Sequence, residues 1–134
     1  MKPNTDGALD KLAQLIGRFV AGGKRVYIIL DIPISAAFDP HKLIQRKVLS
    51  PGFALKSTFR TRAVIENAIR PLNSKPVRVA RDSGATIIDP INWLCSRTVC
   101  PAITPRGDPI YRDMLNLNSA YVRSAGSFVD VTLN

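Results

Sequence analysis

The stretch RVYIILDIPI, residues 25–34, is an almost continuous run of β-branched, aliphatic and aromatic side chains. A strand that is buried on both faces of a parallel sheet has this continuous pattern, whereas a half-exposed strand alternates between apolar and polar residues. Proline lacks the backbone N–H that a sheet ladder requires. The stretch therefore predicts a buried parallel strand that ends at Pro33.

Helices are predicted on both sides of this strand. Residues 6–21 carry apolar side chains at spacings of three and four, and Gly22 and Gly23 supply a stop. Further helices are expected at 40–48, 58–70, 74–82 and 118–130. The expected caps and breaks are Asp39 with Pro40, Ser57 or Thr58, Pro71, Ser74 with Pro76, Gly84, and Asn118. The side chains expected on buried faces are Leu9, Leu12, Leu15, Ile16, Phe19, Val64, Ile65, Ala68, Ile69, Tyr121, Val122, Ala125, Phe128 and Val129.

A second short buried strand is predicted at ATIID, residues 85–89. Residues 51–57 are expected to form a loop, and residues 102–111 have the Pro and Gly content of a loop or loose hairpin. Alternation of strands and helices is typical of the α/β class, in which helices cover both faces of a parallel sheet. The length of 134 residues suits one domain, which we expect to span residues 1–134. Two strands are fewer than an open parallel sheet usually has.

The composition is ordinary for a soluble globular domain, with 46% hydrophobic and 22% charged residues. The longest apolar run, VYIIL at 26–30, is far too short to span a bilayer. The first ten residues lack the apolar region of a signal peptide. From these features we expect no membrane span in this chain.

The net charge is +9, from 19 Lys and Arg against 10 Asp and Glu. Such a charge permits binding to polyanions, including nucleic acid, anionic lipid and acidic polysaccharide. The basic residues are scattered, however, and no series of aromatic residues lies between them as a base-stacking surface would require. No zinc-finger or RNA-binding signature is present. We therefore favour a solvated basic face and disfavour nucleic acid as a partner.

The two cysteines, Cys95 and Cys100, lie in CSRTVC. Their C-x4-C spacing differs from the C-x-x-C redox motif, and the sole histidine, His41, is too far upstream to complete a zinc site. We expect neither a metal nor a cofactor, and we expect His41 to be an exposed residue in a first helical turn. Cysteines five positions apart can form a disulfide, which would imply an oxidising compartment. A reduced pair in a cytosolic protein is the alternative, and the residues leave both open.

The segment of residues 87–126 is the most specific part of the sequence. It contains Asp89-Pro90 after a predicted strand, then the C-x4-C pair, Gly107, and Tyr111-x-Asp113 before the last helix. On these motifs the chain resembles, over about residues 8–130, the C-terminal part of the SGNH hydrolase-like domain fused to bacterial membrane acyltransferases of the acyltransferase type three family. The resemblance implies a partial flavodoxin-like, SGNH-type three-layer fold, with parallel strands flanked by helices and the N-terminal strands missing. It also implies a disulfide between Cys95 and Cys100.

The chain departs from the family at the catalytic positions. The family's nucleophilic serine lies in a Gly-Asp-Ser block, which this sequence lacks, and its oxyanion-hole residues precede the strand that corresponds to residues 25–33. Ser83-Gly84 is expected at a helix end instead. The family's Asp-x-x-His-Leu becomes Asp113-x-x-Asn116-Leu117. By resemblance, Asp113 is the acid of the triad and Asn116 occupies the position of the catalytic histidine.

Serine is a weak nucleophile until an adjacent base takes its proton, and an asparagine amide cannot do so. Loss of the base alone typically lowers turnover on the order of a million-fold. We therefore interpret the site as inactive in this form and leave open whether the chain is an enzyme. We favour the simpler interpretation that Asp113 and Asn116 cap the final helix or stabilise the turn before it.

Three functions compete at this point. The first is a C-terminal fragment of an SGNH-type acyltransferase or esterase domain linked to O-acylation of cell-surface polysaccharide. The second is a non-catalytic module that binds polysaccharide or protein, and the third, less favoured, is a basic nucleic-acid-binding protein. As part of a parent membrane enzyme the domain would lie on the periplasmic side, and expressed alone it would be cytoplasmic. The open edge of the strand at 25–33 is expected to pair with a second copy or with the missing N-terminal half, or else to leave the chain only marginally folded.

Overall fold

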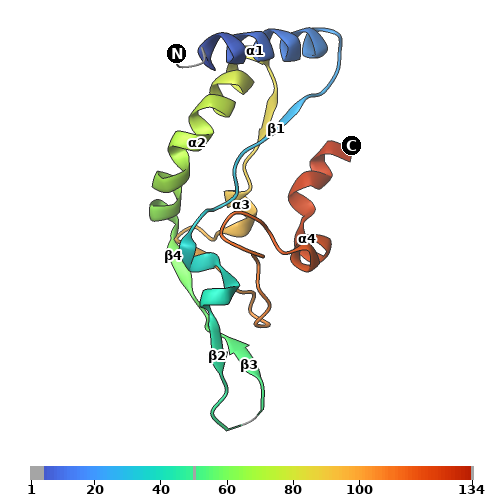
Figure 1. The fold of residues 1–134 in the computed structure, drawn as a ribbon. Helices are drawn as coiled ribbons and strands as arrows, with labels where there is room; N and C mark the ends of the chain where they lie inside the picture. Colours follow the sequence, from blue (N-terminus) through green and yellow to red (C-terminus); the bar gives the residue numbers. More distant parts are fainter. Residues whose placement is uncertain (1–4, 50, 134) are drawn as a thin grey trace. The chain divides into compact units, whose positions relative to one another are not determined.

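The computed structural model describes residues 5–49 and 51–133 of the chain (Figure 1). The chain divides into two compact units, one of Met1–Asp31 with Arg70–Asp89 and the other of Ile32–Ile69 with Pro90–Asn134. Helix α2 (Arg62–Ser83) contributes residues to both units. That residues 1–134 form a single domain stays a prediction.

The first unit contains the two strands expected from the sequence. Strands β1 (Tyr27–Ile29) and β5 (Thr86–Ile88) form a parallel pair. The backbone N–H of Leu30 donates to the carbonyl of Ile88, and that of Thr86 donates to the carbonyl of Val26, each at 2.9 Å. Helix α1 (Thr5–Ala21) and the C-terminal part of α2 belong to the same unit. Parallel strands with flanking helices confirm the α/β class.

Two glycines end the helices of this unit as predicted. Gly23 follows α1 with φ of 77°, and its N–H donates to the carbonyl of Val20. Gly84 follows α2 with the same φ, and its N–H donates to the carbonyl of Ala80. A side chain would strain both positions, because the left-handed conformation that closes a helix favours glycine.

The apolar surface of the first unit is only partly covered. Leu30, Val79, Ala80 and Ile88 are buried, but Ile29 is 50% exposed. The expectation of a fully buried strand was therefore wrong, because a pair of three-residue strands is too small for both faces to be covered. Side chains expected on the buried face of α1 are also about half exposed, namely Leu12, Leu15 and Phe19.

Helix α2 passes through both of its prolines. We expected one helix to end at Pro71 and another to begin at Ser74, and both expectations were wrong. The buried positions Ile65, Ile69 and Asn73 follow one another at a spacing of four, so the buried stripe crosses Pro71 without interruption. A proline removes one helical hydrogen bond, and continuous burial on one face of the helix outweighs that loss.

The second unit holds the remaining elements. A 3-10 turn, η1 (Ala36–Phe38), precedes η2 (Pro40–Lys42), in which Asp39 Oδ1 accepts the N–H of His41 at 3.0 Å. The cap was predicted, but a helix over 40–48 was wrong. Strand β2 (Ile44–Arg46) instead forms an antiparallel pair with β3 (Phe53–Leu55), in a region that we expected to be a loop. Pairing between β2 and β3 stabilises the strand conformation of residues 44–46. The local residue propensities of a single segment do not reveal such pairing.

A second antiparallel pair joins β4 (Phe59–Thr61) to β6 (Val99–Pro101). Helix α2 therefore begins at Arg62, and neither Ser57 nor Thr58 is its cap, contrary to prediction. The short helix α3 (Ile91–Leu94) follows β5. Residues 102–111 form the loose hairpin that was one of the two expectations, closed by an antiparallel bridge between Ile103 and Pro109.

The final helix, α4 (Ser119–Ala125), begins where predicted, with Asn118 Oδ1 accepting the N–H of Ala120 at 2.8 Å. It ends at Gly126, and a 3-10 segment, η3 (Ser127–Leu133), replaces the expected helical continuation. Phe128 is buried as predicted, whereas Val122 is 40% exposed. Among the residues that the structure describes, no helix has the length and hydrophobicity needed to cross a membrane.

One hydrophobic cluster organises the second unit. Its side chains come from η1, the residue after η2, α2, α3 and the residue after it, β6, and the loop before α4. The buried members are Phe38, Leu43, Ile65, Ile69, Ile91, Leu94, Cys95, Cys100, Ala102, Ile103, Ile110 and Tyr111. Of the predicted buried face of α2, Ile65 and Ile69 lie in this cluster, but Val64 is 55% exposed and Ala68 is exposed.

Candidate functional site

The site suggested by the sequence is a closed turn before α4. A bridge joins Tyr111 to Leu117, and the backbone N–H of Arg112 donates to the carbonyl of Asn116 at 2.8 Å. The N–H of Asn118 donates to the carbonyl of Ile110 at 2.9 Å. These bonds bring the side chains of Asp113 and Asn116 together on the surface.

The carboxylate of Asp113 is the acceptor at the centre of the turn. Its Oδ1 accepts the backbone N–H of Leu115 at 2.9 Å, and the Asn116 amide donates to Oδ1 at 2.9 Å and Oδ2 at 3.0 Å. The Nε of Arg112 lies 3.3 Å from Oδ2. The hydrogen bond from Leu115, followed by those from Asn116 and Arg112, lowers the pKa of Asp113 from its ordinary value of 3.8.

This arrangement stabilises an ionised aspartate but offers no proton transfer. In a serine hydrolase the corresponding carboxylate accepts a hydrogen bond from the catalytic histidine, which can then take a proton from the nucleophile. Here the donor in that place is an amide, which does not titrate. The contacts are those of an Asx-type turn, and the catalytic role that the resemblance implies for Asp113 stays a prediction.

The turn is anchored in the hydrophobic cluster through Tyr111. Its ring is fully buried and stacks on Phe38, with ring centroids 4.6 Å apart and an interplanar angle of 12°. Within the described part of the chain, the Tyr111 hydroxyl has no hydrogen-bond partner. Burial, followed by the nearby Tyr121, raises the pKa of Tyr111 well above its ordinary value of 10.0. Tyr111 therefore acts as a hydrophobic anchor.

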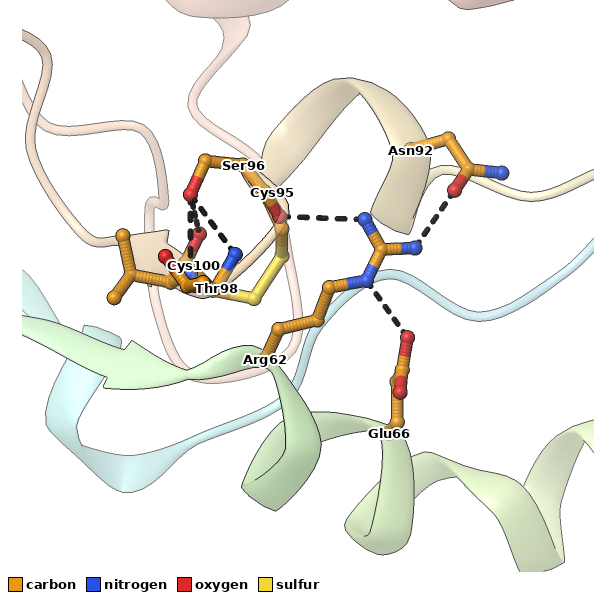
Figure 2. Close-up of a disulfide and its surroundings, with 8 residues drawn as sticks. Arg62, Glu66, Asn92, Cys95, Ser96, Thr98 and Cys100 are labelled. Atoms are coloured by element: carbon orange, nitrogen blue, oxygen red, sulfur yellow. Dashed lines mark hydrogen bonds and ion pairs between the residues drawn. A yellow bond between two sulfur atoms is a disulfide. The ribbon is translucent and has the colours of Figure 1, made fainter.

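A disulfide joins Cys95, which follows α3, to Cys100 in β6 (Figure 2). The pairing implied by the resemblance is thus present. Both cysteines are buried in the cluster. Within the intervening loop, Ser96 Oγ accepts the N–H groups of Thr98 and Val99. The cross-link and these bonds fix the loop that leads from α3 into β6.

Arg62 connects this loop to the start of α2 (Figure 2). Its Nε donates to Glu66 Oε1 at 2.7 Å, its Nη2 to Asn92 Oδ1 at 2.8 Å, and its Nη1 to the carbonyl of Ser96 at 3.3 Å. Its backbone N–H also donates to the carbonyl of Thr98 at 2.7 Å. The sequence analysis did not identify this cluster. The only local signal was the spacing of four between Arg62 and Glu66, which suits an ion pair on a helix.

The comparison with protein families covers nearly the whole chain. The family model described as SGNH domain (fused to AT3 domains) matches residues 2–125. The chain belongs to this family. The searches of curated proteins and of solved structures gave no match. The parallel pair β1–β5 with its flanking helices is accordingly a partial SGNH, flavodoxin-like fold, and the chain is a hydrolase- or acyltransferase-like SGNH domain.

The other residues that the sequence singled out, His41 and Ser83, make local contacts within their own turns. The His41 side chain is 79% exposed, and its Nδ1 lies 2.9 Å from Asp39 Oδ1. The hydrogen bonds to His41 lower the pKa of Asp39. Ser83 is buried at the end of α2, where its hydroxyl donates to the carbonyl of Ala80. In the described residues, no group of three or more His, Cys, Asp and Glu side chains could hold a metal ion.

Proposed function

We propose that this SGNH domain serves the O-acylation of cell-surface polysaccharide on the periplasmic side of the membrane, and that the 134 residues have no acyl-transfer or ester-hydrolysis activity by themselves. Membership of a family fused to AT3 domains supports the link to acyl transfer. The observation that carries the proposed inactivity is the Asp113–Asn116 pair, in which an amide takes the place of the base.

The inactive state has three supports. Asn116 cannot accept a proton from a nucleophile. The Asp113 carboxylate already accepts hydrogen bonds from Leu115 and Asn116 and lies beside Arg112. The printed sequence contains no Gly-Asp-Ser block that would place a serine at a nucleophile turn. A histidine at position 116 would restore only the base of a catalytic triad, and the members of a triad act as a unit.

Hydrolysis of p-nitrophenyl acetate tests this proposal. We expect the natural chain, Asn116→His, and the matched control Asp113→Ala with Asn116→His all to hydrolyse the ester at the rate of buffer plus an inert protein. The ester is activated and small, so even a weak nucleophile would be detected. Turnover by Asn116→His well above the matched control would show that a serine elsewhere in the chain completes a triad.

The proposed function includes a partner at the edge of β1. Val26 and Leu30 hydrogen-bond to β5 through their backbone groups. Alternate residues of a strand direct these groups to the same side, so the N–H and C=O of Ile28 also point toward β5. Ile29 then directs its N–H and C=O to the opposite side, and its side chain is 50% exposed. A strand edge beside partly exposed apolar side chains is a template for pairing. We assign this edge to a second copy or to the N-terminal half of an SGNH domain.

Size-exclusion chromatography with light scattering tests the edge. We expect the natural chain to self-associate at tens of micromolar, and Ile29→Lys to shift it toward the monomer. Because Ile29 is half exposed, this substitution perturbs the interior less than one at a buried position would. Leu133→Lys, which changes a side chain that is 82% exposed, is the control. A cooperatively folded monomer for the natural chain would contradict pairing with a second copy.

A further inference from the structure

The β2–β3 hairpin presents an apolar tip that its own unit does not cover. Its strands pair Ile44 with Leu55 and Arg46 with Phe53, and the N–H of Lys47 donates to the carbonyl of Gly52 at 3.2 Å. Leu55, at the base, packs against the hydrophobic cluster. Figure 1 shows the rest of the hairpin extending beyond the other strands of its unit. The base is therefore anchored, whereas Val48, Leu49 and Phe53 are not part of the described cluster.

Three apolar side chains at the tip are in water. Val48 is 95% exposed, Leu49 98% and Phe53 73%. Single exposed apolar residues are ordinary on protein surfaces. Here two adjacent aliphatic residues of the turn and the first residue of β3 line the same hollow at the end of one hairpin. Nothing in the described part of the second unit covers these side chains. Their transfer from water into an apolar medium would therefore lower the free energy.

Exposed cations lie at both ends of this hairpin. Arg46 and Lys47 lead into the tip, and Lys42 and Lys56 flank the base. Lys42, Arg46, Lys47 and Lys56 are all exposed, and none of them makes an ion pair with the described residues. The sequence has no Asp or Glu between Asp39 and Glu66. The hairpin thus combines an apolar tip with unpaired positive charge along its length, and these four cations are called the collar below.

We propose that the β2–β3 hairpin docks on the surface of an anionic phospholipid bilayer. Val48, Leu49 and Phe53 enter the boundary between headgroups and acyl chains, and Arg46 and Lys47 contact the anionic headgroups. Lys42 and Lys56, at the base, add longer-range attraction to the anionic surface. Apolar insertion and a polybasic collar are the two signals that together hold a protein on a membrane without a spanning helix. The inference is independent of the function proposed above.

The tip suits a bilayer better than it suits other polyanions or a protein. Contact with nucleic acid through the cations would leave Val48 and Leu49 in water. A stable protein interface buries about 800 Å² on each partner, which a turn carrying three apolar side chains does not supply. A bilayer covers a convex tip of any shape, because lipids rearrange around it.

Flotation of the full chain with vesicles tests the proposal. We expect binding to vesicles of phosphatidylglycerol and phosphatidylcholine, and weak binding to phosphatidylcholine alone. The variant Val48→Ser with Leu49→Ser keeps the net charge of +9. Since each buried methylene contributes about fourfold to partitioning, this variant should bind at least roughly tenfold more weakly. Leu133→Ser, at a side chain 82% exposed outside the hairpin, should bind like the natural chain.

Separate measurements test the role of the cations and the depth to which the tip inserts. Arg46→Gln with Lys47→Gln should weaken binding by about fivefold for each charge removed, and added salt should reduce this difference. A tryptophan introduced by Leu49→Trp should be quenched by lipids brominated on their acyl chains, beyond the quenching of Trp93 in the natural chain. Circular dichroism confirms that each variant is folded.

Two results would overturn the proposal. If the Val48→Ser, Leu49→Ser variant binds as well as the natural chain and Leu49→Trp is not quenched, the protein adsorbs by charge alone. If vesicles do not bind and the same variant converts an oligomer into a monomer, the hairpin is a contact between copies of the chain. Strong binding that depends on Val48 and Leu49 and is accompanied by quenching supports insertion.

Discussion

The side-chain amide of Asn116 donates hydrogen bonds to both carboxylate oxygens of Asp113, at 2.9 and 3.0 Å. Two residues at positions that resemble a catalytic acid and base are therefore joined, but in a bond that holds a turn closed. The backbone N–H of Leu115 completes the arrangement at 2.9 Å. The resemblance places Asp113 and Asn116 at the spacing of a catalytic acid and base, and the amide of Asn116 cannot take up a proton.

The Asp113 contacts predict how stability depends on pH. Because the pKa of Asp113 is lowered from 3.8, the folded state favours the ionised carboxylate. Its contribution is fully present above pH 3.8 and is lost as the pH falls through the lowered pKa of the folded state. Asp113→Ala should therefore melt at a lower temperature than the natural chain at neutral pH, and the difference should shrink in acid.

Thermal unfolding followed by circular dichroism at neutral pH and well below pH 3.8 checks this expectation. The difference between the two proteins is the relevant quantity, because the lowered pKa of Asp39 makes acid sensitivity common to both. Asp130→Ala changes an exposed aspartate in η3 and serves as the control. An Asp113→Ala difference of equal size at both pH values would contradict the role of the ionised carboxylate.

Tyr111 should tolerate loss of its hydroxyl but not of its ring. Since the buried hydroxyl lacks a partner in the described part of the chain, Tyr111→Phe should change the free energy of unfolding by about 1 kcal/mol or less, in the stabilising direction. Tyr111→Ala removes the ring that stacks on Phe38 and should destabilise by about 3–5 kcal/mol. Denaturation in urea measures both, and a clear loss of stability in Tyr111→Phe would mean that the hydroxyl is satisfied.

Lysine should replace Arg62 only in part. Its guanidinium reaches Glu66, Asn92 and the carbonyl of Ser96, and a lysine ammonium cannot span three acceptors in that plane. Arg62→Ala should destabilise by about 1.5–3 kcal/mol, the range for hydrogen bonds to a charged group, and Arg62→Lys should recover only part of this. Arg60→Ala should cost less than about 0.5 kcal/mol, because among the described residues the Arg60 side chain reaches only the carbonyl of Phe59. If Arg62→Lys and the natural chain are equally stable in urea, the three hydrogen bonds of the Arg62 guanidinium do not stabilise the fold.

The Cys95–Cys100 cross-link should stabilise the fold modestly. A ring closed over five positions restricts the unfolded chain little, so Cys95→Ala with Cys100→Ala should destabilise by about 2 kcal/mol. Titration of thiols in unreduced, denatured protein, purified from an oxidising compartment, should find none. Two reactive thiols per chain would show that the bond does not form, and would also weaken the proposed periplasmic location.

Local signals predicted several elements correctly. The apolar run at 25–34 and ATIID gave the two parallel strands, and the caps at Asp39 and Asn118 hold in the structure. Prediction failed where distant segments meet. Residues 40–48 have a helical start at Pro40, yet Ile44–Arg46 pairs with Phe53–Leu55 as a hairpin. Pro71 is a strong local break, yet the buried stripe through Ile69 and Asn73 carries α2 past it.

The sequence by itself determined the family, the α/β class, the pairing of Cys95 with Cys100 by resemblance, and the lack of a base at Asn116. These follow from residue identity and spacing along the chain. Only the tertiary structure decided that the Asn116 amide closes on Asp113, that Arg62 clamps the disulfide loop, and that Val48 and Leu49 project from a hairpin. The physical reason is that hydrogen bonds between distant segments, and exposure to water, depend on what the folded chain brings together rather than on local preference.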